Sequence, residues 1–182
     1  MKLNTNNIII IFFSIAAYCH LGNAMIWDTV PEGHVGIYYR LGGKLMEHTS
    51  DPGFYLKAPW PITSASEIQI TPQTDVLHNV ECGAKDGTQL YFKQVEVGNH
   101  LKKDSVYSTV KRFTENYDTY LIKDKVRHQI NVICSSLNSQ EIYIEKFDTL
   151  DDELKEFLQK ENDKENSGVI VDFVRLSKPT LP

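Results

Sequence analysis

The sequence of 182 residues lacks the basic excess and the repeats that mark many nucleic-acid-binding proteins. Its 19 Lys and Arg residues are outnumbered by 24 Asp and Glu residues, which gives a net charge of −5. Neutralising phosphates requires a basic patch, so this balance argues against a nucleic-acid partner. No Asn-x-Ser/Thr glycosylation sequon occurs in the chain either.

Motifs for catalysis, cofactors and metal ions are also missing. The histidines lack the paired spacing of a metal site, so we predict no bound metal. No glycine-rich loop opens a helix after a strand, and nothing resembles a serine-hydrolase elbow. We therefore predict that the protein is not an enzyme and that it carries no cofactor.

Cysteine is scarce, with only three residues, and Cys19 lies in an apolar leader. Cys82 and Cys134 can pair in an oxidising compartment, but two cysteines so far apart do not make a disulfide framework. We expect two separate thiols, with Cys134 in the core and Cys82 exposed before a turn. A thiol enzyme that uses Cys82 or Cys134, with His78 or His100 as a conceivable base for Cys82, is a third alternative for the function.

Charged residues are absent from Ile8 to Leu21, a run preceded by Lys2. A helix extended to Trp27 reaches the roughly 30 Å of a bilayer core, so residues 1–27 are long enough for a transmembrane signal-anchor. The alternative is a signal peptide cleaved after Ala24. Both place the rest of the chain in the lumen, because the positive end stays cytosolic. The predicted membrane contacts in this segment are Ile8, Ile9, Ile10, Ile11, Phe12, Phe13 and Trp27.

The first part of the remaining chain alternates between apolar and polar positions, separated by turn residues, and this pattern predicts strands. Pro72 inside one of these runs indicates an edge position or a bulge. The loop 58–62 is apolar, stiffened by proline, and carries Trp60; it either dips into the membrane interface or folds over the domain's own core. The predicted strands are His34–Arg40, Lys44–Glu47, Ser66–Val76 and Leu90–Val97.

After Asp104 the apolar residues recur at steps of three and four residues, which is the spacing of helices. Asp104 is the predicted cap of a short helix, and Asn116 or Asp118 that of a longer one with an apolar stripe from Ile122 to Leu137. Thr149 is the predicted cap of Leu150–Glu161, whose buried side holds Leu154, Phe157 and Leu158. Val169–Leu176 returns as a strand. Strands first, helices next and a strand last predict an α+β fold.

Several runs in order resemble the stomatin–prohibitin–flotillin (SPFH, or band 7) family, among them PEGHVGIYYRLGGKL and DPGFYLKAPWP. PQTDVLHNVECG, NYDTYLIKDKVRHQINVICSS and QEIYIEKFDTLDDELK narrow the resemblance to the erlins, the endoplasmic-reticulum members. It covers roughly residues 30–182. It implies an SPFH domain of mostly antiparallel sheet packed with helices, after an N-terminal transmembrane signal-anchor helix.

The same resemblance implies a single-pass scaffold of the endoplasmic-reticulum membrane with its domain in the lumen. Erlins assemble with other SPFH subunits, bind cholesterol-rich membrane, and link clients such as inositol trisphosphate receptors to ubiquitin-ligase-mediated ER-associated degradation. The family has no catalytic residues to transfer. Erlins continue past this region into long helices that drive assembly, so a ring is not expected from this chain alone. The alternative is a soluble lumenal or secreted binding module released after Ala24.

Overall fold

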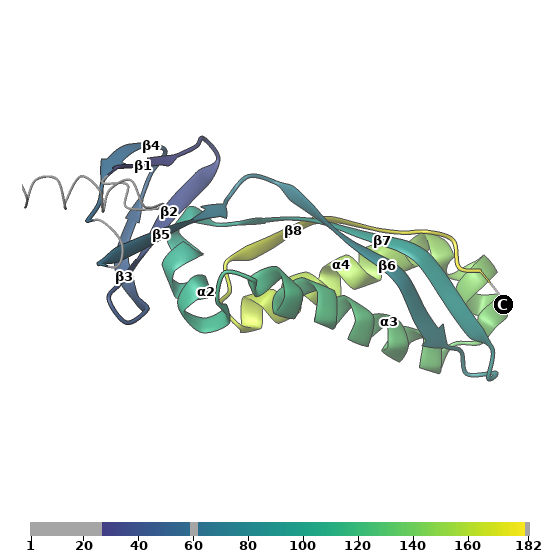
Figure 1. Ribbon diagram of the computed structural model, residues 1–182. Coiled ribbons are helices and arrows are strands. Elements are labelled where there is room, and N and C mark those ends of the chain that lie inside the picture. The colour runs from purple at the N-terminus through teal and green to yellow at the C-terminus, as the bar shows by residue number, and fades with distance from the viewer. Residues whose placement is uncertain (1–26, 59–61, 181–182) are drawn as a thin grey trace, which may run out of the picture. The chain divides into compact units, whose positions relative to one another are not determined.

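The computed structural model describes residues 27–58 and 62–180, which belong to two compact units (Figure 1). The N-terminal unit runs to Ile68 and the C-terminal unit begins at Gln69. Strands come first, helices follow, and a strand closes the chain, which confirms the predicted α+β class.

The described part of the N-terminal unit consists of short strands in two small sheets. One sheet pairs β1 (Trp27–Val30) with β4 (Gly53–Leu56), and the other has the order β3-β2-β5. β2 is its central strand, with a neighbouring strand on each edge, and its residues from Val35 to Tyr38 are buried. The bounds in this second sheet are β2 (His34–Arg40), β3 (Lys44–Ser50) and β5 (Thr63–Gln69).

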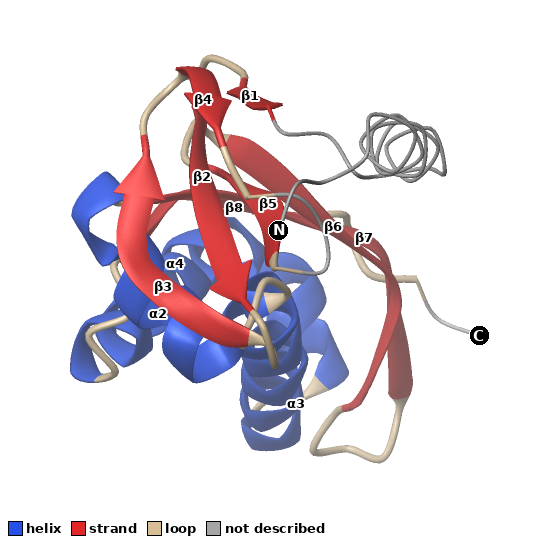
Figure 2. Cartoon of the chain, turned by 60° about the vertical axis from the view of Figure 1, so that its left-hand side comes forward, coloured by secondary structure: helices blue, strands red, loops and turns tan. Residues whose placement is uncertain are grey.

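The C-terminal unit is an antiparallel sheet with helices packed on one face (Figures 1 and 2). β7 (Gln89–Leu101) lies between β6 (Gln73–Gly83) and β8 (Val169–Leu176). α3 packs against β6, and α4 packs against β8. The helical bounds are η1 (Lys103–Ser105), α2 (Val106–Phe113), η2 (Thr119–Asp124), α3 (Lys125–Ser136), η3 (Glu141–Glu145) and α4 (Phe147–Lys164).

The helices bury the stripes that the sequence predicts. On η2 and α3 the buried positions recur at three- and four-residue steps, and on α4 they recur every four residues, so each helix turns one apolar side to the sheet. The predicted side of α4 is confirmed for Leu154 and Leu158, while Phe157 is only half-buried. The buried stripe residues are Ile122, Val126, Ile130, Ile133, Leu150, Leu154 and Leu158.

The predicted caps and one predicted strand are wrong in detail. The strand expected through Pro72 is broken there: β5 ends at Gln69 and β6 begins at Gln73, because proline cannot donate to a ladder. No side chain forms a capping hydrogen bond at the N-terminus of η1, α2, η2 or α4. Asp118 instead pairs with Lys123 at 3.1 Å, and the Thr149 hydroxyl donates to the Lys146 carbonyl at 2.9 Å.

The outer edge of β8 is covered by side chains of α4. The backbone N–H of Val171 donates to Gln159 Oε1 at 2.9 Å, and that of Leu176 donates to Asp151 Oδ1 at 3.0 Å. An uncovered strand edge invites pairing with other chains. α4 therefore takes the place of a neighbouring strand along β8.

Cys82 of β6 and Cys134 of α3 form a disulfide, which corrects the prediction of two separate thiols. The two residues are 4% and 1% exposed, so the expected exposure of Cys82 is also wrong. Their sequence separation of 52 residues hid the pairing, because only the packing of α3 on β6 brings them together. Because Cys82 and Cys134 are joined to each other, the alternative of a thiol enzyme loses both of its candidate nucleophiles.

The close approach of β8 to β7 depends on Gly98. A Cβ atom at position 98 would lie 2.2 Å from Cε1 of Phe173, so a side chain there must displace the ring. We expect Gly98→Ala to lower the free energy of unfolding by about 1–3 kcal/mol, measured by urea denaturation. Gly83→Ala is the matched control, because nothing lies within 4 Å of a Cβ atom at that position. Equal losses of unfolding free energy in the two variants would contradict the role given to the contact between Gly98 and Phe173.

The β6–β7 turn is held to the segment after α3 by the carboxylate of Asp86. It accepts hydrogen bonds from the N–H of Thr88 at 3.0 Å, and from the N–H and hydroxyl of Ser139 at 3.0 and 2.5 Å. The Ser139 hydroxyl and these two N–H groups lower the pKa of Asp86 well below its usual range. The folded chain therefore holds this carboxylate in its charged form.

We expect Asp86 to make part of the stability dependent on acid pH. Because its folded pKa is lowered, its contribution is present above the unfolded pKa of about 4 and is lost as the pH falls. Asp86→Asn should flatten the decline in unfolding midpoint between about pH 5 and pH 2. Asp124→Asn is the control, since the exposed carboxylate of Asp124 has no hydrogen-bond or ion-pair partner among the described residues. A decline that is unchanged in Asp86→Asn would contradict the expectation.

Candidate membrane-facing surface

The pairing of β1 with β4 gathers apolar side chains on one face of a two-stranded ribbon. Trp27 lies directly opposite Leu56, and Thr29 lies opposite Phe54. Directly opposed residues share a face, and so do residues two apart on a strand. The four side chains therefore form one face, which contains no charged group; we call it the ribbon face.

The ribbon face is exposed in the described structure. Trp27 is 50%, Phe54 65% and Leu56 78% exposed. Apolar side chains that are scattered singly on a surface are ordinary, but a contiguous set marks an interaction site. The arrangement is chemically suited to an apolar medium or partner.

The opposite face of the same ribbon belongs to the interior of the N-terminal unit. Val30 is 4% exposed, and Gly36 has no room for a side chain because a Cβ atom there would lie 2.7 Å from Val30 Cγ2. Asp28 pairs with Lys57 Nζ at 3.3 Å, so the charges beside the ribbon neutralise each other. Burial also raises the pKa of Tyr38 and keeps its phenol neutral. The ribbon thus turns its polar and buried side inward and its apolar side outward.

Of the predicted membrane contacts, the structure describes only Trp27. It is the first residue of β1, so the helix that was expected to extend to it overlaps this strand. Trp60 and the run from Ile8 to Phe13 lie outside the described residues. None of the helices within 27–58 and 62–180 has the length and apolar character needed to cross a bilayer.

Sequence reasoning missed Phe54 and Leu56, which supply most of the ribbon face. The available signal was the alternation Phe54-Tyr55-Leu56 after the turn at Gly53. Alternation alone does not say which side faces solvent, and the cross-strand partner of Leu56 was unknown. Trp27 became part of the same surface only through the register of β1 and β4.

A cluster of titratable groups around Lys123 joins two elements of the C-terminal unit. No group of three or more His, Cys, Asp or Glu residues lies close enough in this part of the chain to hold a metal ion. Lys123 Nζ bridges Asp75 and Asp118 at 3.1 Å each. Burial and these two carboxylates raise the pKa of Tyr117 to about 12. This network ties η2 to β6.

Comparison with known proteins assigns the family. The SPFH domain / Band 7 family matches residues 28–182. Over 153 residues, or 84% of this chain, the sequence is 47% identical to Erlin-2-A of Xenopus laevis, 44% to Erlin of Caenorhabditis elegans and 40% to Erlin-1 of Homo sapiens. The aligned region covers 45%, 48% and 43% of these proteins, so the chain spans about half the length of these curated relatives. The chain belongs to the SPFH domain / Band 7 family.

Proposed function

We propose that this protein is an erlin-type scaffold of the endoplasmic-reticulum membrane. The apolar leader that precedes β1 would tether it, and the domain would lie in the lumen beside the bilayer. The ribbon face carries this proposal, because an uncharged exposed face with two aromatic residues, Trp27 and Phe54, suits the membrane interface. Trp27 follows Leu21, the last residue of the apolar run, by only six positions. A tether there would hold the ribbon within reach of the bilayer surface.

The disulfide between Cys82 and Cys134 supports the lumenal side. Disulfides persist in oxidising compartments such as the endoplasmic-reticulum lumen and are rare in the cytosol. The charge bias of the leader points the same way, because Lys2 would remain cytosolic. The proposed localisation therefore has support from two independent features.

The proposed partners are cholesterol-rich membrane, other SPFH subunits, a ubiquitin ligase and clients of ER-associated degradation such as inositol trisphosphate receptors. The apolar cavity lined by Phe92, Ile130 and Leu154 in the core measures about 10 Å³. Pockets for small molecules are usually several hundred Å³, so this cavity is too small for a sterol. Any preference for sterol would act through the membrane contact and not through this cavity.

Carbonate extraction and protease protection of the tagged full chain test the proposal. An anchored lumenal scaffold remains in the membrane pellet and is digested only after detergent opens the vesicles. Release into the soluble fraction, or digestion in intact vesicles, would overturn it. N-terminal sequencing addresses the alternative of a soluble lumenal module, since that protein would begin at Met25.

A further inference from the structure

The turn between β2 and β3 exposes a large apolar side chain. Leu41 is 63% exposed there, and its backbone N–H donates to the carbonyl of Ile62 at 3.0 Å, which brings a second exposed apolar residue beside it. The N–H of Gly43 donates to the carbonyl of Arg40 at 2.9 Å and closes the turn. Gly42 has a φ of +86°, a value that favours glycine. The turn is therefore a defined structure that presents apolar side chains to its surroundings.

Two cationic side chains stand directly opposite each other at the base of this turn. Arg40 of β2 pairs with Lys44 of β3 in the register of the sheet. The Cβ atoms of such opposed residues lie about 5 Å apart, and like charges in this position repel each other. Both side chains are exposed, and neither has a hydrogen-bond or ion-pair partner among residues 27–58 and 62–180. An anion bound between the two cations would relieve their repulsion.

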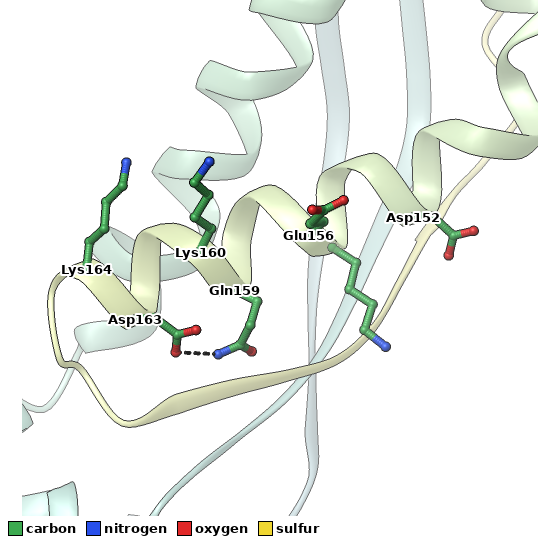
Figure 3. A pocket seen from close by; sticks show the side chains of 7 residues that line it. Asp152, Glu156, Gln159, Lys160, Asp163 and Lys164 are labelled. Carbon is green, nitrogen blue, oxygen red and sulfur yellow. Dashed lines mark hydrogen bonds between the residues drawn. The ribbon is translucent and has the colours of Figure 1, made fainter.

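The outer side of α4, by contrast, balances its own charges. The open depression there is lined by three acidic and three basic side chains (Figure 3). Glu156 stands four residues before Lys160, which is the favourable order within a helix. The β2–β3 turn has no such balance, because the chain from Arg40 to Lys44 contains two basic residues and no acidic one. The turn therefore attracts an anionic partner, and the outer side of α4 does not.

An exposed apolar turn beside two cations matches the chemistry of an anionic phospholipid. The headgroup phosphate accepts hydrogen bonds from guanidinium and ammonium groups, and the interface below it takes up large apolar side chains. A free phosphate would occupy the cations but leave Leu41 in water. We propose that the β2–β3 turn is a second membrane contact, in which Leu41 enters the interface while Arg40 and Lys44 bind the phosphate of an anionic phospholipid. This inference rests on the proposed function, because the tether brings the N-terminal unit to the bilayer.

The turn and the ribbon face contact the membrane at separate points of the N-terminal unit. The ribbon packs on β2 at Gly36, where a Cβ atom would lie 2.7 Å from Val30 Cγ2. Leu41 follows Gly36 by five residues, which corresponds to about 17 Å of extended strand. The ribbon face has no charged group and gives no preference for a headgroup. The turn therefore supplies the selection for an anionic lipid.

Photo-cross-linking of the full chain in lipid vesicles tests the inference. In Leu41→p-benzoylphenylalanine the photoreactive side chain forms adducts with whatever lies against the turn, and mass spectrometry identifies the adducts. The vesicles contain phosphatidylcholine with a minor share of phosphatidylserine. One cation beside an anionic surface strengthens binding by about five-fold. We therefore expect phosphatidylserine adducts to exceed the share of this lipid in the vesicles by at least about five-fold.

Charge-neutral variants of the photoreactive chain test the two cations. Arg40→Gln/Lys44→Gln should lower the enrichment to the share of phosphatidylserine in the vesicles and leave adducts with the neutral lipid. Lys85→Gln/Lys93→Gln is the matched control, because it removes two exposed cations from the C-terminal unit. It should leave the enrichment unchanged, and circular dichroism verifies that both variants are folded. Equal loss of enrichment in both variants would overturn the assignment to the turn.

A second photoreactive position separates this inference from the proposed function. Leu56→p-benzoylphenylalanine places the same group on the ribbon face. Lipid adducts at position 56 but not at position 41 overturn the second contact and leave the scaffold function standing. Lipid adducts at neither position overturn both proposals. Adducts at position 41 with a second copy of the chain, or with lipid in proportion to the vesicle composition, also overturn the headgroup contact.

Discussion

Removing the Cys82–Cys134 disulfide is expected to lower the free energy of unfolding by about 4 kcal/mol. The bridge closes a loop with a sequence separation of 52 residues, and in the chain-entropy view a loop of that length restricts the unfolded ensemble by about this amount. The bond also joins β6 to α3, so its loss loosens the helix that covers this strand. Cys82→Ala/Cys134→Ala should therefore unfold at much lower urea than the native chain.

The measurement is urea unfolding of the full chain in mild detergent, followed by circular dichroism. Cys19→Ala is the matched control, because it removes the remaining cysteine and leaves the bridge intact. The state of the bridge is checked by alkylation of the denatured, unreduced protein. Modification of all three cysteines under those conditions would show separate thiols and contradict the expectation.

Aspartate at both Phe54 and Leu56 is expected to weaken vesicle binding of residues 25–182 by about 100-fold. Each large apolar side chain that leaves water contributes at least about 1.5 kcal/mol, and 1.4 kcal/mol corresponds to a factor of ten in affinity. Both side chains are exposed, so the substitutions leave the buried core of the N-terminal unit unchanged. Without the leader, binding reports the ribbon face directly.

Flotation with cholesterol-containing vesicles measures this binding. Ile144→Asp is the matched control, because this residue is 68% exposed but lies in η3 of the C-terminal unit. It should float like the unaltered chain. Equal binding by all three proteins would remove the membrane role of the ribbon face, and equal loss in both variants would show a nonspecific effect of added charge.

Local patterns in the sequence predicted the elements of the C-terminal unit well. Val169–Leu176 was predicted with the bounds of β8, and the stripe through Val126 and Ile130 identified the buried side of α3. Both depend on side-chain period, which neighbouring residues along the chain define. The helix starts were predicted less well, because a residue such as Asp118 forms an ion pair in place of the expected cap.

The candidate surface was less predictable, because its residues come from strands that are distant in sequence. The sequence identified the apolar leader and the tryptophans, but it gave no reason to combine Trp27 with Leu56. That combination depends on the register of β1 and β4, because a shift of one residue would place the two side chains on opposite faces. The sequence showed the charges of α4 only as a mixed-sign run, because the buried side of the helix was unknown.

The sequence by itself determined the class of this protein: an α+β member of the SPFH family, with one apolar leader and without catalytic motifs. Composition, period and motif order are properties of neighbouring residues, so they can be read without coordinates. Tertiary structure decided the Cys82–Cys134 bridge, the ribbon face and the outward side of α4. Each of these depends on which distant segments meet, and that is fixed only when the whole chain buries its apolar surface together.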